Sequence, residues 1–465
     1  MMILSGQGLL WGCHGAGGLR AGAVWRPPPG KRGALLHRAL VERPCPCIRR
    51  LGGRRSQEMR FTRLLRHEAM SIEAIAAQAA ALTAGRVAGR DILAIQDTSE
   101  LVFGGPKARA RGFGPVGKGG NLGGLLLHPV LAVEAGSGAL VGLADVAVWN
   151  RTGGKVRPRR KRATQGKESQ RWLTGAARAG QVLAAASRIT VVADRESDIY
   201  ELFARRPANV ELIVRAAQNR AIEDGTRLFA HIDGLPENGR VRTRIPAAPG
   251  RAERDTVLAL RHAAVRLRKP RHGAAKDLPA SLAVSVVDVR EVAAPPGVKP
   301  VHWRLLTTYQ VANLADAGMV LDRYRQRWTI ERYFHTTKTG GFDIEAAEIG
   351  APTALARLVA AVALAAVTVM QLVQARDGNT AQPLSHVIEY EDQPLLEALS
   401  RDLEGTTARQ KNPHRKGSLG FAAWVLARLG GWTGYYGKPG PLVIRRGLHD
   451  FQRIKHGAIL RARLA

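Results

Sequence analysis

Cysteine is scarce in this sequence. The 465 residues include three cysteines, Cys13, Cys45 and Cys47, and all of them lie in the N-terminal stretch. They cannot form a distributed disulfide framework, and a Cys-x-Cys pair without ligand histidines nearby is a weak metal signal. The sequence therefore gives no indication of a disulfide-stabilised secreted protein, and a reducing cytoplasm is the simplest location.

Acidic residues are also few. Asp and Glu total 38 against 70 Lys and Arg, which gives a formal net charge of +32 and a pI near 11.2. Such an excess raises the concentration of polyanions around a protein. The basic residues continue as far as Arg463, which disfavours a single basic tail. The charge balance therefore predicts a nucleic-acid-binding protein.

Long hydrophobic runs and several common catalytic motifs are absent. The longest uncharged apolar run, Leu358 to Val373, is short for a membrane span and predicts a buried helix. Leu9 to Cys13 has no positively charged segment before it, so we expect no signal peptide. The sequence contains no H-E-x-x-H motif, no zinc-ligand spacing and no Gly-rich loop in the order G-x4-G-K-[ST].

The pattern along the chain predicts several domains, because 465 residues exceed one ordinary core. Residues 1–33 are rich in Gly, Arg and Pro without periodicity, and we expect a disordered or spurious extension. Residues 34–82 predict a helical N-terminal domain. Residues 83–375 predict a second domain with strands and helices, and residues 376–465 predict a helical C-terminal domain.

The order of elements within residues 83–375 predicts the fold class. Strands are expected at 91–95, 125–133, 139–148 and 188–193, with a helix at 169–186 before the last strand and a helix after it. This order is typical of an α/β domain of the RNase H-like type. Residues from about 209 to 309 form short β-rich segments between Gly, Pro and charged breaks, which predicts an antiparallel β insertion.

One predicted helix, residues 322–340, carries an unusual set of side chains. Tyr324, Arg327, Glu331 and Lys338 are spaced 3, 4 and 7 residues apart, so they share one face if the helix reaches Lys338. A carboxylate, two cations and a phenol are suited to gripping a phosphate beside a metal ligand. The alternative is an ordinary solvated helix with charge pairs four residues apart.

Two aspartates follow short apolar strands elsewhere in the chain. Asp97 comes after DILAIQ and Asp194 comes after RITVVA. A single aspartate in such a place is usually a turn or cap residue. Together with Glu331, however, the pair makes a possible site of three carboxylates, the hard oxygen ligands that Mg²⁺ prefers. Two such ions can activate the attacking oxygen and stabilise the leaving oxygen of a phosphodiester.

These stretches resemble the insertion-sequence DDE transposases that carry a Tyr-Arg-Glu-Lys signature, the IS-four family that includes the Tn-five transposase. Tyr324, Arg327, Glu331 and Lys338 fill the signature Y-x2-R-x3-E-x6-K without a gap. The blocks IQDTSEL at 95–101, KESQRWL at 167–173 and ADRESDIYEL at 193–202 also resemble the family. The likeness extends over residues 34–465.

The resemblance implies an enzyme that cuts and joins double-stranded DNA at transposon ends and at a target. Asp97, Asp194 and Glu331 would hold two Mg²⁺ ions, for which Mn²⁺ could substitute. Tyr324, Arg327 and Lys338 would bind phosphates of the transposon end. The expected protein is a bacterial, nucleoid-associated transposase. It would work as a homodimer with no role for a membrane, pass through a hairpin intermediate, and read the terminal repeat with its N-terminal helices.

Two further residues gain a role from the same resemblance. Trp303 lies 21 residues before Tyr324, where the family carries an aromatic platform for an unstacked base. The alternative is a tryptophan packed on the sheet. Arg215 is placed to reach DNA near the site, with a solvated strand arginine as the alternative.

Two segments have predicted contacts of their own. The segment 151–167 holds eight Lys or Arg in 17 residues, which predicts contact with DNA phosphates. By resemblance the C-terminal region, with Trp424, Leu426, Leu429 and Trp432, would supply the dimer contact. The alternative for that region is a plain core helix.

Two other functions stay open at this point. The first is a catalytically inactive transposase derivative or inhibitor, which keeps the basic surface but not a working site. The second is another nuclease of the same fold, which has no need to stabilise a hairpin. The carboxylate triad argues against the first, and the unusual first 33 residues argue mildly for it. The Tyr-Arg-Glu-Lys face, the β insertion and Trp303 argue against the second.

Overall fold

A computed structural model describes residues 30–151, 167–245, 252–271, 275–378, 380 and 382–464. All eleven strands of the described residues belong to one large mixed sheet. Nine of them follow the order β2-β4-β1-β6-β7-β11-β10-β9-β8, and β3 and β5 each pair with β4 outside this order. The strands are β1 Asp91–Gln96, β2 Ser99–Val102, β3 Gly114–Val116, β4 Leu122–Glu134, β5 Leu140–Trp149, β6 Arg188–Ala193, β7 Glu211–Arg215, β8 Gly239–Ile245, β9 Arg254–Arg268, β10 Ser281–Glu291 and β11 His302–Thr307.

The central strands have the pairing that an RNase H-like domain requires. β5, β4 and β1 are successive antiparallel neighbours, whereas β6 pairs parallel with β1 and β7 pairs parallel with β6. The four strands expected from the sequence correspond to β1, β4, β5 and β6, and those predictions are confirmed. The protein is therefore a mixed α/β structure, consistent with the expected RNase H-like domain.

Strands β8 to β11 are antiparallel and extend the same sheet beyond β7. A start near residue 209 would place β7 in the predicted insertion, whereas β7 pairs parallel with β6 and belongs to the central group. The extent of the insertion stays a prediction.

Both faces of the central sheet are buried. In β1, Leu93 and Ile95 point into one apolar cluster, and Ile92 and Ala94 point into the other. This alternation is what a strand covered on both sides requires. One face is covered by α4 Ile72–Ala84, α9 Leu314–Arg325, α10 Trp328–Thr337 and α11 Pro352–Ala375, and the other by α6 Gln170–Val182, α7 Tyr200–Ala204 and α8 Leu228–Asp233.

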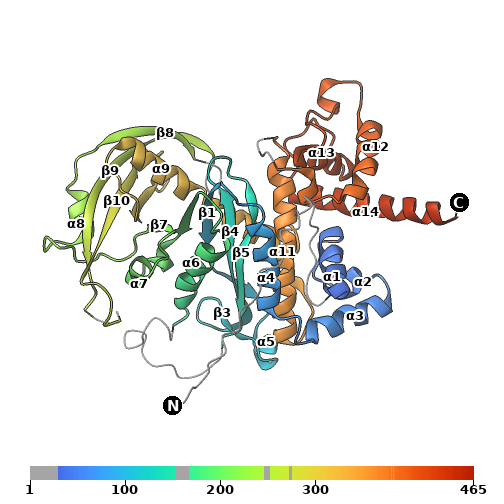
Figure 1. The fold of residues 1–465 in the computed structure, drawn as a ribbon, viewed down its shortest axis with the longest axis horizontal. Helices are drawn as coiled ribbons and strands as arrows, with labels where there is room; N and C mark the ends of the chain where they lie inside the picture. The colour runs from blue at the N-terminus through green and yellow to red at the C-terminus, as the bar shows by residue number, and fades with distance from the viewer. Residues whose placement is uncertain are drawn as a thin grey trace, which may run out of the picture.

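Helix α11 lies at the centre of the molecule. Figure 1 shows it between the sheet on one side and the helices from the two ends of the chain on the other. Among the described residues it alone is long and apolar enough to cross a membrane, but 83% of its apolar window is buried inside the protein. This burial confirms the prediction of a buried helix over Leu358 to Val373.

The N-terminal helices are α1 Gly30–Glu42, α2 Ile48–Gly52 and α3 Arg55–Arg66, followed by α4. Helix α1 begins at Gly30, inside the predicted extension, while residues 1–29 lie outside the described residues, so the character of the extension stays a prediction. Buried residues of α1, α3 and α4 belong to the same apolar cluster as one face of the sheet. A separate N-terminal domain ending at residue 82 thus stays a prediction.

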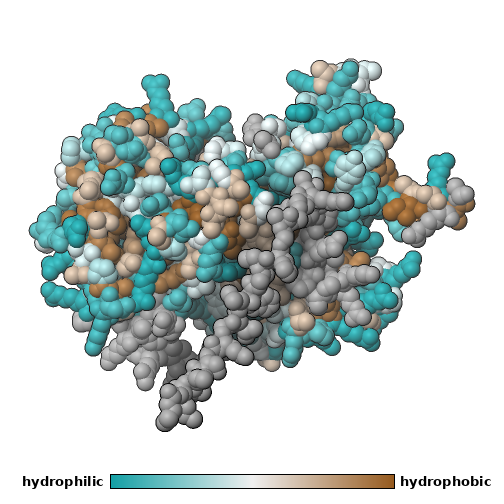
Figure 2. All heavy atoms as spheres, in the orientation of Figure 1, coloured by the Kyte–Doolittle hydropathy of each residue, from teal (hydrophilic) through white to brown (hydrophobic). Residues whose placement is uncertain are grey.

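The C-terminal helices are α12 Gln393–Leu403, α13 Leu419–Leu429 and α14 Pro441–Leu464. Trp424 and Leu426 of α13 are buried within the chain, which favours the alternative of a plain core helix for these two side chains. The end of α14 projects from the body and exposes Ile459 and Leu460 (Figures 1 and 2).

Candidate active site

Two aspartates meet at one edge of the sheet. Asp97 follows the last residue of β1, and Asp194 follows the last residue of β6. The two strands are parallel neighbours in the register Ile95 to Val192, and each aspartate lies two residues beyond its partner in that pair. Parallel strands end at the same edge, so the register brings the two carboxylates together, as the sequence predicted.

The helix expected over 322–340 is two helices instead of one. α9 ends at Arg325 and α10 begins at Trp328, with Gln326 and Arg327 between them. Nε2 of Gln326 donates a hydrogen bond of 2.6 Å to the carbonyl of Ala135, which anchors the chain at this break. The prediction of one continuous helical face was therefore wrong.

Despite the break, three signature residues reach the aspartates. Nη1 of Arg327 lies 3.1 Å from Oδ2 of Asp97 and 3.2 Å from Oε1 of Glu331, so one guanidinium bridges two carboxylates. The hydroxyl of Tyr324 donates to Oδ1 of Asp194 at 3.3 Å. The structure thus brings Asp97, Asp194 and Glu331 around Arg327 and Tyr324.

The electrostatics of this cluster show a shortage of positive charge. Burial, together with the nearby carboxylates of Glu331 and Asp194, raises the pKa of Asp97 from 3.8 to about 6. The Thr98 amide and the Arg327 guanidinium oppose this rise but do not cancel it. Burial and the Asp194 carboxylate likewise raise the pKa of Tyr324. An added cation would relieve the repulsion between the carboxylates.

Lys338 bonds other groups than the three carboxylates. Helix α10 ends at Thr337, and Lys338 Nζ donates to the backbone carbonyl of Glu100 at 2.6 Å and lies 3.6 Å from Oε1 of Glu345. Because α10 ends one residue before Lys338, the condition for a face shared with Glu331 is not met, and the role of Lys338 stays a prediction. The lysine instead lies beside Glu100 of β2, which follows Asp97 by three residues in the sequence.

Arg215 and Trp303 border the same site from β7 and β11. Nη1 of Arg215 lies 3.8 Å from Oδ1 of Asp194. The half-buried ring of Trp303 packs edge to face on Tyr324, with 5.4 Å between ring centroids. Both residues therefore lie next to groups that contact the carboxylates, and their roles toward DNA stay predictions.

The basic segment 151–167 can be placed by its ends, because residues 152–166 lie outside the described residues. Arg151 pairs with Glu100 and with Glu168, each at 2.8 Å. The segment therefore begins and ends beside the strand that follows Asp97.

Comparison with protein families agrees with this geometry. Residues 164–367 match the family model of the transposase DDE domain. The match includes Asp194, Glu331 and the signature residues, and it begins after Asp97. It supports a DDE transposase, and it makes DNA the expected partner.

Several polar residues near Asp97, Asp194 and Glu331, which together form the DDE site, were not predicted from the sequence. Thr98 directly follows Asp97, and its hydroxyl contacts Nδ1 of buried His128 at 2.9 Å and Nε of Arg171 at 2.7 Å. Arg171 lies within the KESQRWL block, and His128 interrupts an apolar strand. These were the available signals, but neither shows that the three residues meet.

DDE transposases generally use divalent ions, and the question here is whether Asp97, Asp194 and Glu331 could hold them. In the described part of the chain, no three His, Cys, Asp or Glu side chains are arranged so that they could hold a metal ion. The donor chemistry nevertheless fits, since three carboxylates converge and the pKa of Asp97 is raised in their company. A bound ion would compete with Arg327 for Asp97 and Glu331.

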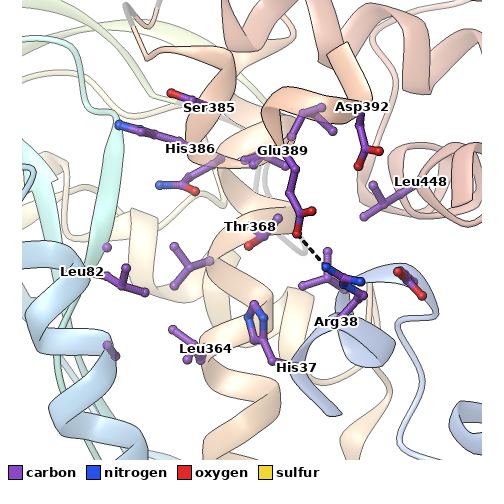
Figure 3. Close-up of a pocket in the computed structure, with 18 of the residues that line it drawn as sticks. His37, Arg38, Leu82, Leu364, Thr368, Ser385, His386, Glu389, Asp392 and Leu448 are labelled. Carbon is purple, nitrogen blue, oxygen red and sulfur yellow. Dashed lines mark hydrogen bonds and ion pairs between the residues drawn. The ribbon is translucent and has the colours of Figure 1, made fainter. Parts of the chain in front are cut away.

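A cavity of about 160 Å³ lies elsewhere, between α1, α4, α11 and α14. Figure 3 shows Arg38 of α1 paired with Glu389, at a distance of 2.9 Å. None of the predicted site residues lines this cavity. It is a junction between the N-terminal and C-terminal helices and takes no part in the carboxylate site.

Proposed function

We propose that this protein is an active cut-and-paste DNA transposase, with Asp97, Asp194 and Glu331 as its catalytic carboxylates. The observation that carries the proposal is the convergence of these side chains at the shared edge of β1 and β6, beside Arg327. The match to the transposase DDE domain supports the reaction class. The Tyr-Arg-Glu-Lys signature makes the IS-four family the finer assignment.

The three carboxylates would hold two Mg²⁺ ions, and Mn²⁺ could substitute. Two such ions activate an attacking oxygen and stabilise a leaving oxygen during in-line displacement at phosphorus. Because cleavage, hairpin formation, hairpin opening and strand transfer are all displacements of this kind, one site can serve each of them.

Three cationic side chains and the phenol of Tyr324 would bind and orient the DNA backbone. Arg327 and Tyr324 contact the carboxylates directly, so each is placed to hold a phosphate beside them. Lys338 and Arg215 lie farther out and would hold neighbouring phosphates. The net charge of +32 would draw DNA to the protein in a salt-dependent manner.

Trp303 would support a base that is unstacked during hairpin formation. Extruding a base costs a few kcal/mol, and stacking on an aromatic ring returns about 1–3 kcal/mol. Its contact with Tyr324 places the indole next to a side chain that bonds Asp194.

The helical ends of the chain would complete the assembly. Helix α3 exposes Arg55, Arg60, Arg63 and Arg66, and such a basic surface is suited to the phosphates of a terminal repeat. The C-terminal helices would join two copies in a synaptic homodimer. The expected location is the bacterial cytoplasm, close to the nucleoid.

The inactive derivative or inhibitor is not favoured, because the carboxylates are present and lie together. A simple nuclease of the same fold would share the carboxylates but would not depend on Trp303 for a hairpin.

The proposal is tested with a labelled duplex of the element's own end, purified protein, and Mg²⁺ or EDTA. We expect Mg²⁺-dependent cleavage at the end with a hairpin product, which is lost in Asp194→Ala. Cleavage without a hairpin in the wild type would point to the simple nuclease. Binding without Mg²⁺-dependent cleavage would point to the inactive derivative.

A further inference from the structure

A chain of hydrogen bonds runs beneath Asp97. Nε of Arg171 donates to Oγ1 of Thr98 at 2.7 Å, and Oγ1 of Thr98 lies 2.9 Å from Nδ1 of His128. Nε2 of His128 lies 3.2 Å from Oε1 of Gln96, and Nε2 of Gln96 donates to the carbonyl of Trp172 at 3.3 Å. The chain thus connects the end of β1 to helix α6 through a histidine of β4.

The direction of each hydrogen bond follows from its neighbours. Because the Gln96 amide nitrogen donates to a carbonyl, its Oε1 must accept from His128 Nε2–H. Burial lowers the pKa of His128 to about 3, so the ring is neutral and carries one N–H. With that N–H on Nε2, Nδ1 accepts the hydrogen bond that the Thr98 hydroxyl donates.

Arg171 also reaches the loop that carries the second aspartate. Its Nη2 donates to Oε2 of Glu196 at 2.5 Å, and Glu196 lies two residues after Asp194. One guanidinium therefore joins the residue after Asp97 to the turn after Asp194. The rings of Trp149 and Trp172 pack near this guanidinium, at 5.8 and 5.2 Å.

The surrounding structure is shaped to accommodate this network. His128 and Gln96 are 3% and 0% exposed, so each would destabilise the fold without its hydrogen bonds. Gly175 of α6 leaves the necessary space, because a Cβ there would lie 2.2 Å from Oε1 of Gln96. The backbone amide of Thr98 completes the link by donating to Oδ1 of Asp97 at 2.7 Å.

We infer that Arg171 and His128 are positioning residues, which act through Thr98 and Glu196 to hold the Asp97 and Asp194 carboxylates at a fixed separation. The inference rests on the proposed role of these carboxylates as ligands of divalent ions. Residues that orient ligands in this way typically change metal affinity about 10–100-fold when they are mutated.

The test measures the binding of Mn²⁺ to the full-length protein without DNA, from the electron paramagnetic resonance signal of the free ion. We expect Thr98→Val and Arg171→Met to weaken binding about 10-fold or more. Arg171→Lys should recover part of the loss, since an ammonium keeps the charge but lacks the planar fork that reaches two partners. Glu196 is 68% exposed, so Glu196→Gln should fold and weaken binding by a smaller factor, about 3-fold.

Two matched substitutions serve as controls. The hydroxyl of Thr83 in α4 bonds the carbonyls of Ala79 and Leu143, and Arg254 in β9 pairs with Glu291 at 2.8 Å. Thr83→Val and Arg254→Met should reduce thermal stability and leave Mn²⁺ affinity unchanged.

The possible results separate the two levels of the hypothesis. If the wild type binds Mn²⁺ and cleaves DNA, but the Thr98, Arg171 and Glu196 variants bind Mn²⁺ equally well, the positioning role is overturned and the proposed function stands. If the wild type itself neither binds Mn²⁺ nor cleaves DNA, the proposed function fails and the positioning role fails with it.

Discussion

Two aspartates of the same large sheet, Asp97 and Asp288, show how differently this protein treats carboxylates. Asp97 shares Arg327 with Glu331, lies near Asp194, and has a pKa raised to about 6. Burial alone would also raise the pKa of Asp288, yet the hydrogen bond and charge of His302 and the charge of Arg290 lower it. Asp97 shares one guanidinium with a second carboxylate, whereas Asp288 lies beside several guanidinium groups.

The surroundings of Asp288 explain its lowered pKa. Its carboxylate is 1% exposed and lies within 4 Å of the guanidinium groups of Arg261, Arg290 and Arg304 and of the imidazole of His302. Charges that are balanced in this way connect strands β9, β10 and β11. Because the negative charge of Asp288 is already neutralised by these partners, its carboxylate is not available to bind a metal ion.

Strand β11 contributes to both regions from its opposite faces. His302 and Arg304 turn toward Asp288, while Trp303 between them turns toward Tyr324 and the DDE site. Alternation along a strand thus keeps the cluster around Asp288 apart from the carboxylates around Arg327. The comparison teaches that a buried carboxylate with a raised pKa and few cationic neighbours is the better candidate for a functional residue.

The largest contrast is expected in DNA cleavage. Glu331→Gln should reduce end cleavage about a thousandfold or more, because it removes a charged ligand from the reacting site. Asp288→Asn should leave the rate of the folded protein within a few-fold of the wild type. Single-turnover cleavage of a labelled end in Mg²⁺ measures both, and equal losses in the two variants would remove the distinction.

Stability should respond in the opposite order. Asp288→Ala leaves neighbouring arginines without their buried partner and should reduce the free energy of unfolding by about 3–5 kcal/mol. Urea denaturation without metal measures the loss. Asp233→Ala is the control, because Asp233 pairs with Arg290 and Arg304 but is 48% exposed and should cost below about 1 kcal/mol. A loss of similar size in both variants would contradict the assignment.

Asp97→Asn should stabilise the metal-free protein. A carboxyl whose pKa rises on folding binds its proton more tightly in the folded state, so its ionisation destabilises that state as the pH rises from about 4 to about 6. The gain at pH 7.5 in EDTA should be about 3 kcal/mol, and it should vanish below about pH 4. Denaturation curves at several pH values test this, and a gain that does not depend on pH would show another cause.

The smallest expected effect concerns Trp303. Trp303→Ala should slow hairpin formation about 10-fold through the loss of one stacked base, while the first nick keeps its rate. Trp303→Phe is the matched control and should retain most of the hairpin rate. Product analysis on a denaturing gel separates the two steps, and an equal slowing of both would favour simple packing of the indole.

The sequence predicted the parts of the site that depend on local pattern. Apolar strands ending at Asp97 and Asp194 were visible as short runs, and the parallel pairing of β1 with β6 makes their ends coincide. The signature also identified Tyr324, Arg327 and Glu331, because residues three or four apart remain close even across the break between α9 and α10.

Other features could not be predicted because they depend on long-range contacts. The break near Gln326 contains no proline or glycine, and the anchoring carbonyl of Ala135 lies 191 residues away in sequence. Helix α10 ends before Lys338, and the lysine bonds the carbonyl of Glu100. A spacing of seven residues in the sequence does not reveal where the helix ends. The hydrogen bond between Arg171 and Thr98 joins residues that are 73 positions apart, so it can be found only once the fold is known.

The most direct test of the central claim is calorimetric titration of Mn²⁺ into the metal-free wild type, Asp97→Asn and Asp288→Asn at pH 7.5. The charge shortage at Asp97 predicts that the wild type and Asp288→Asn bind the ion with similar affinity. Asp97→Asn should bind it at least about 10-fold more weakly. Equal affinity in all three proteins would contradict the claim that the carboxylates at the edge of β1 and β6 form the ion site.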